Sequence, residues 1–205
     1  MTIIIIGITV LISIAAFNNR QLFERFQFNA YRIYHHKEWY RILTHGFLHA
    51  NYTHLIVNML VLFFFGTAAE KWLQVLESDG MIKYYRLVYV LFYLVAIILA
   101  SSISLFKHKN NTWYNAVGAS GAVSAVLFFN IFFNPWEKIY VYALIPVPGI
   151  ILGVAYLVYS HIMGKKQADN INHDAHLLGA IFGFVFPLLL DVRLINHFIH
   201  ELLRM

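Results

Sequence analysis

Residues 112–128, TWYNAVGASGAVSAVLF, carry no charge, yet glycine, alanine and serine crowd the stretch. Ser120 and Ser124 lie four residues apart and would share one face of a helix, while Gly118 and Gly121 thin the backbone around Ser120. Membrane helices use small residues at this spacing to approach one another closely. Taken alone, the stretch predicts either a packing surface or a serine placed for chemistry.

The composition indicates a membrane protein. Of 205 residues, 60% are hydrophobic and 12% charged, whereas soluble domains are roughly half apolar and a quarter charged. We expect one domain, residues 1–205, because no linker, repeat or low-complexity tract divides the chain. The formal charge of +5 is scattered through short connections, so we expect no nucleic-acid partner. The lack of cysteine excludes disulfides, thiolate metal sites and a cysteine nucleophile.

Six apolar stretches are candidate membrane spans. About 20 apolar residues cross a bilayer, and shorter stretches are tolerated inside a bundle. The long unbroken runs lack the alternation of a membrane barrel, so we expect an all-α, polytopic bundle of six transmembrane helices. The fifth helix is expected to begin at Pro148, since proline suits a first turn. The six expected spans cover about residues 3–17, 53–72, 87–106, 116–133, 148–162 and 173–190.

The sixth stretch changes the interpretation of Ser120. A histidine and three small residues recur at i, i+3, i+4 and i+7 and make one helical face: His176, Gly179, Ala180 and Gly183. Packing this face on the serine face would bring Ser120 and His176 together inside the membrane, where ionisable side chains are usually functional. Histidine can take the proton of a serine hydroxyl and return it to a leaving amine. Ser120 and His176 are therefore a candidate dyad.

The second stretch supplies candidate donors for an oxyanion. Attack on an amide carbonyl creates a negative oxygen that needs hydrogen-bond donors aimed at it. His54 and Asn58 are one helical turn apart, and Ser120 near a helix start adds free N–H groups and the positive end of the dipole. His54 could also be a buried histidine bonded to a carbonyl, and Asn58 an interhelical hydrogen bond. Their joint occurrence favours the chemical interpretation.

These motifs resemble those of the rhomboid intramembrane serine proteases. The parts occur in the order of that family and in the expected second, fourth and sixth helices, after a first-loop motif. They are WYR at 39–41, HGFLHANYTHLIVN at 45–58, GASG at 118–121 and AHLLGAIFG at 175–183.

The resemblance implies a Ser-His dyad, without a third acidic member, that cuts substrates at or near the membrane. Ser120 would be the nucleophile and His176 the general base, and His54, Asn58 and the Ser120 amide would form the oxyanion hole. No cofactor is implied. The expected partners are membrane lipid and the transmembrane helices of single-pass membrane proteins. The expected location is a cell membrane crossed several times, a prokaryotic inner or plasma membrane.

Three residues near the dyad need separate interpretation. Many bacterial members have a tyrosine four residues after the nucleophile, packed on the catalytic imidazole, where this chain has Ser124. His173 lies one turn before His176, but the AHLLG motif aligns on His176. Asp174 projects from a nearly opposite helix face, so we interpret it as a solvated charge at a loop end and not as a triad acid.

Two other functions stay open. A rhomboid-like pseudoprotease would bind membrane helices without cutting them, although its usual mark is loss of the serine or histidine, and both are present. A histidine-rich channel or metal transporter would explain His45, His49 and His54. Their spacing bridges a loop-to-helix boundary without a nearby carboxylate, so we expect no metal site.

Overall fold

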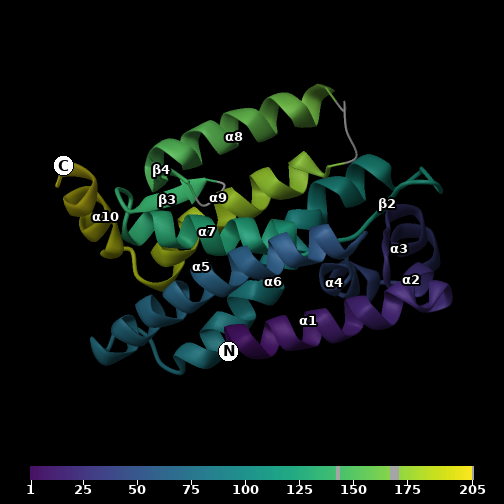
Figure 1. Cartoon of the computed structure of the whole chain (residues 1–205), viewed down its shortest axis with the longest axis horizontal. Coiled ribbons are helices and arrows are strands. Elements are labelled where there is room, and N and C mark those ends of the chain that lie inside the picture. Colours follow the sequence, from purple (N-terminus) through teal and green to yellow (C-terminus); the bar gives the residue numbers. More distant parts are fainter. Residues whose placement is uncertain (142–143, 167–170, 205) are drawn as a thin grey trace.

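The chain folds into a bundle of helices with two small pairs of strands (Figure 1). The computed structural model describes residues 1–141, 144–166 and 171–204. Within those ranges three helices are long and apolar enough to cross a membrane: α5 (Tyr52–Ser78), α6 (Tyr85–His108) and α9 (His173–Leu190). Three further helices fall on the other expected spans: α1 (Thr2–Phe17), α7 (Ser120–Phe133) and α8 (Gly149–Lys166). A membrane bundle is thus supported, and its six spans stay a prediction.

Shorter elements fill the connections. The first loop contains α2 (Arg20–Phe26), α3 (Ala30–His36), α4 (Arg41–Thr44) and the 3-10 turn η1 (His45–Phe47), and α10 (Leu194–Leu203) follows α9. Strand β1 (Phe28–Asn29) pairs antiparallel with β2 (Asn115–Ala116), and β3 (Lys138–Val141) pairs antiparallel with β4 (Ile145–Pro148).

The strands add to one expectation and correct another. The fold is mostly helical, with two short strand pairs beside the helices, and Pro148 does not open a helix. It is the last residue of β4, opposite Lys138, and α8 begins one residue later at Gly149. A two-stranded hairpin tolerates proline because each strand is an edge with unpaired backbone positions. The expected fourth span, 116–133, also begins later than expected, because Ala116 pairs with Phe28 of β1 and α7 starts at Ser120.

Helix α7 forms the centre of the core. Twelve of its 14 residues are buried, as expected for a helix that is apolar on every side. Phe129 contacts Phe92 of α6, with ring centroids 5.4 Å apart, and the Asn130 amide donates to the Phe65 carbonyl of α5 at 2.8 Å. The helix that begins at Ser120 is thereby held from several sides.

Glycines allow α9 to lie directly on the backbone of α7. A Cβ built on Gly179 would lie 2.0 Å from the carbonyl oxygen of Gly121, and one built on Gly183 would lie 2.0 Å from that of Ala125. No side chain fits at either position, so the absence of one is what permits the contact. The predicted packing of the two small-residue faces is confirmed.

A buried arginine ties the first loop together. Arg41 is 1% exposed, and its guanidinium donates to the backbone carbonyls of Glu24 and Gln27, each at 2.8 Å, and pairs with the Glu38 carboxylate. A buried charge is stable only when paired and fully hydrogen-bonded, and these acceptors meet that need. Arg41, the last residue of the WYR motif, therefore anchors the loop that leads to α5.

Candidate active site

The contact between α7 and α9 brings a serine and a histidine together. Ser120 is the first residue of α7 and His176 lies on the first turn of α9. The distance between Ser120 Oγ and His176 Nε2 is 2.8 Å, which is a hydrogen bond. A hydroxyl bonded to an imidazole is the arrangement in which the ring can accept the proton as the oxygen attacks.

The turn before Ser120 depends on Gly118. This residue has φ +129°, a conformation that L side chains rarely adopt, and its N–H donates to the His45 carbonyl at 3.0 Å. The bond ties the turn to the first loop, and the helix starts two residues later. The N–H groups of the first turn of a helix have no partner within the helix, and they present partial positive charge beside the Ser120 hydroxyl.

His54 faces the same turn from α5. The side chain of Asn51 caps α5 by accepting from the His54 N–H at 2.8 Å, and the Ala50 N–H donates to His54 Nδ1 at 3.4 Å. Because Nδ1 accepts, the neutral ring carries its proton on Nε2 and can donate there. A Cβ built on Gly118 would lie 3.1 Å from His54 Nε2 and 3.8 Å from Ser120 Oγ. The same Cβ would lie 2.8 Å from His54 Cε1, so the His54 ring packs directly against the Gly118 backbone, near Ser120 Oγ.

Asn58 is buried one turn after His54. Its Nδ2 donates to the carbonyl oxygen of His54 at 2.8 Å, so the amide makes a bond within α5 and not the interhelical bond considered above. The same nitrogen carries a second N–H. A contribution of Asn58 to an oxyanion hole stays a prediction.

A tyrosine that sequence analysis did not single out lies beside the dyad. Tyr156 of α8 has its hydroxyl 2.6 Å from Ser124 Oγ, and its ring centroid is 6.1 Å from that of His176 with the ring planes 21° apart. In the sequence, a sign of this position is that Tyr156 shares one helical face with Gly149 and Gly153.

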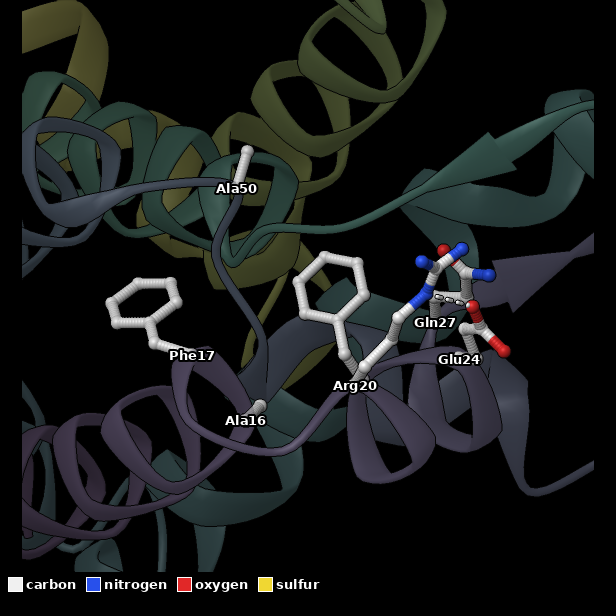
Figure 2. A pocket seen from close by; sticks show the side chains of 7 residues that line it. Ala16, Phe17, Arg20, Glu24, Gln27 and Ala50 are labelled. Carbon is white, nitrogen blue, oxygen red and sulfur yellow. Dashed lines mark hydrogen bonds and ion pairs between the residues drawn. The ribbon is translucent and has the colours of Figure 1, made fainter.

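Two hollows lie near the candidate residues. A cavity of about 30 Å³ is lined by residues that include His45, Gly118 and Ser120, and it has room for a water molecule. A larger, open pocket of about 430 Å³ lies between the end of α1, α2 and Ala50 (Figure 2), and its charged groups, Arg20 and Glu24, form an exposed ion pair. The small cavity is the better candidate site because it is lined by Ser120, whose hydroxyl is bonded to His176.

Comparison with known proteins identifies the family of the chain. The family model described as the Rhomboid domain matches residues 36–192, which include the candidate dyad and the second-helix motif. The chain belongs to the rhomboid family.

Two proteins similar to this rhomboid come from a plant. The Arabidopsis thaliana protein named RHOMBOID-like protein 12, mitochondrial, is 32% identical over 149 residues, 68% of this chain and 43% of that protein. Rhomboid-like protein 11, chloroplastic, from the same plant is 29% identical over 177 residues, 78% of this chain and 55% of that protein. The matched part is therefore about half of each relative. Names that refer to mitochondria and chloroplasts lend no support to the expected prokaryotic cell membrane.

Two further histidines of the rhomboid order the entrance to α5. Burial lowers the pKa of His45 to about 4, and burial with the neighbouring His54 lowers the pKa of His49 to about 3, so both are neutral at pH 7. His45 Nδ1 lies 3.0 Å from the Arg41 carbonyl and His49 Nδ1 lies 3.0 Å from Ser13 Oγ. Among the described residues, no three ligating side chains gather as a metal site would require.

The two polar residues that precede His176 have other contacts in the rhomboid. Asp174 accepts from Lys107 Nζ at 3.0 Å, so it is an ion-paired residue and not simply a solvated charge. The His173 ring is buried and contacts the Tyr159 ring, with centroids 5.4 Å apart. The serine is bonded to His176, as the alignment on AHLLG predicted.

Proposed function

We propose that this rhomboid is an intramembrane serine endopeptidase that cleaves transmembrane or juxtamembrane segments of membrane proteins. The observation that supports the proposal most strongly is the 2.8 Å bond between Ser120 Oγ and His176 Nε2 at the start of a buried helix. Hydroxyl and imidazole groups are costly within a membrane bundle, and their pairing beside a cavity is suited to acyl transfer.

In the proposed first step, Ser120 Oγ attacks the carbonyl carbon of the scissile peptide bond. His176 Nε2 accepts the hydroxyl proton as the new carbon–oxygen bond forms, and then donates it to the leaving amine. The result is an acyl-enzyme on Ser120. In the second step the water oxygen attacks the ester carbon while His176 takes a proton from that water. His176 then returns the proton to Ser120 Oγ as the ester bond breaks, and the fragment with the new carboxyl group leaves. The cavity beside Ser120 has room for that water.

The negative oxygen of each tetrahedral intermediate would lie between His54 Nε2 and the Ser120 amide. The His54 ring packs against Gly118, two residues before Ser120, and the Ser120 amide adds a donor from the positive end of α7. The second N–H of Asn58 is the third proposed donor. Each donor would act on charge that develops in the transition state and so would raise turnover more than substrate binding.

We also infer that six helices span the membrane: α1, α5, α6, α7, α8 and α9. The shortest of these, α7, has 14 residues, or roughly 21 Å at 1.5 Å per residue, less than the ~30 Å hydrocarbon core. A short helix is acceptable at this place because α7 is surrounded by other helices and does not need to match the lipid. The site at its first residue would then lie below the membrane surface, where water must reach it.

Labelling with a fluorophosphonate probe tests the proposal together with cleavage of a single-pass membrane protein in proteoliposomes. We expect the wild-type chain to be labelled and to cleave, and Ser120→Ala and His176→Ala each to abolish cleavage while unfolding at an unchanged temperature. The double variant should be no worse than either single variant, because the members of a dyad act as one unit. Ser102→Ala is the matched control, since that hydroxyl is bonded to its own helix at the Leu99 carbonyl.

The same experiment separates the alternatives. Cleavage that persists in Ser120→Ala would refute the assigned nucleophile. A folded wild-type chain that neither reacts with the probe nor cleaves would instead support the pseudoprotease, which binds membrane helices without hydrolysis.

A further inference from the structure

Helix α8 has one face turned toward the helices of the dyad. Gly149, Gly153 and Ser160 are buried, and Tyr156 lies at the same angular position on the helix. A Cβ built on Gly153 would lie 3.2 Å from Ile131 Cδ1 of α7, so α8 lies close to α7 here. The opposite face is roughly half exposed, with its apolar side chains turned outward: Ile151, Val154, Val158 and Ile162.

Tyr156 connects this outer helix to both helices of the dyad. Its hydroxyl is 2.6 Å from Ser124 Oγ, one turn after Ser120 on α7. Its ring lies nearly parallel to the His176 ring on α9, 6.1 Å between centroids and 21° between planes. The Phe128 ring of α7 lies 5.8 Å from it as well. The tyrosine is therefore fixed at its hydroxyl and at its ring.

We propose that Tyr156 is a positioning residue for His176 and that Ser124 holds it in place. The inference rests on the proposed function, because it concerns the base of that dyad. The helix that carries Tyr156 lies at the edge of the bundle (Figure 1) and packs on α9, α7 and the β3–β4 hairpin. A displacement of α8 would withdraw the ring, so the alignment of His176 depends on where α8 lies.

Tyr156 would act by restricting the orientation of the His176 imidazole plane. The last torsion of a histidine side chain has a broad energy profile, so the ring turns easily unless a neighbour restricts it. Proton transfer requires Nε2 to point at Ser120 Oγ, and a neighbouring ring in an offset-stacked arrangement limits the turn. Tyrosine has two principal side-chain torsions, and the bond to Ser124 restricts both.

The test compares Tyr156→Leu, Tyr156→Phe and Ser124→Ala in proteoliposomes. Measured quantities are kcat and KM for a single-pass substrate, the rate of acylation of Ser120 by a fluorophosphonate, and the NMR shifts of the His176 ring protons. Those signals are assigned by their loss in His176→Gln. Val158→Ala is the control, because Val158 lies on the exposed face of the same helix.

We expect Tyr156→Leu to lower kcat and the acylation rate on the order of 100-fold, as misplaced catalytic groups do, with KM almost unchanged and the ring-proton shifts altered. Tyr156→Phe and Ser124→Ala keep the ring and lose one hydrogen bond, so each should lower kcat roughly 2- to 10-fold. The double variant Tyr156→Phe/Ser124→Ala should be no worse than the single variants, since both remove the same bond. The control should match the wild type.

Unchanged kcat and acylation in Tyr156→Leu would overturn the inference and leave the proposed function intact, since Ser120→Ala would still be inactive. A rise in KM alone would also overturn it, because Tyr156 would then bind substrate. If Tyr156→Leu does not fold, the double variant Tyr156→Phe/Ser124→Ala decides. Losses of kcat that add in the double variant would refute the proposal that Ser124 acts through Tyr156. If the wild type does not react, the proposed function fails, and unchanged His176 shifts in Tyr156→Leu would still refute the contact.

Discussion

Replacing Gly179 with alanine should separate the two helices of the dyad. The added Cβ would lie 2.0 Å from the carbonyl oxygen of Gly121, whereas real Cβ contacts are essentially never shorter than 3.0 Å. The obstructing atom is backbone and cannot rotate away, so α9 must shift from α7 by about 1 Å or more. A shift of that size along the line between Ser120 and His176 would stretch their 2.8 Å bond beyond hydrogen-bonding distance.

The expected magnitudes follow from this displacement. Overpacking of a tight core costs about 1–3 kcal/mol of unfolding free energy. A misplacement of about 1 Å in a catalytic group lowers turnover on the order of 100-fold, or about 2.7 kcal/mol of activation free energy. Thermal unfolding in detergent measures the first effect, and cleavage of a single-pass substrate in proteoliposomes measures the second.

Gly7→Ala is the matched control for that experiment. A Cβ built on Gly7 meets no atom within 4 Å, and alanine in a helix is more favourable than glycine by roughly 0.5–1 kcal/mol. Its unfolding temperature should therefore rise slightly while cleavage stays unchanged. If Gly179→Ala behaves like Gly7→Ala in both measurements, α7 and α9 do not pack along this face and the reasoning is wrong.

Three other substitutions separate catalytic from structural roles. Asn58→Ala should lower kcat on the order of 100-fold with little change in KM, and an effect on KM alone would assign Asn58 to binding or packing. Arg41→Ala should lower the unfolding free energy by about 3 kcal/mol, because buried carbonyl acceptors lose their donor. The control Arg32→Ala removes a 55% exposed partner of Glu38 and should lower it by less than about 1 kcal/mol. Equal midpoints of unfolding in denaturant for the two variants would contradict this prediction. Asp174→Asn removes a partly exposed ion pair with Lys107 and should leave kcat within about threefold. A loss of kcat similar to that of His176→Ala would make Asp174 a member of the site.

Helix positions and small-residue faces could be predicted because both follow from local spacing. The sixth expected span, 173–190, coincides with α9, and the second begins one residue from the start of α5. Each apolar run is long enough to form its own hydrogen-bonded helix, and tertiary contacts change only its ends. The helix start was placed one residue early because proline is tolerated both in a first helical turn and at a strand edge, and the pairing of Pro148 with Lys138 is separated by ten residues in the sequence.

For the candidate site, too, some features follow from local sequence spacing and others only from tertiary structure. Residue spacing within single helices determined that Ser120 has a small-residue face, that His176 lies on another such face, and that His54 and Asn58 are one turn apart. Tertiary structure decided which atoms meet: His176 Nε2 with Ser120 Oγ, and the Tyr156 hydroxyl with Ser124 Oγ. Helical periodicity specifies the direction of a side chain from its own axis, but the distance between two axes depends on every side chain that packs between them.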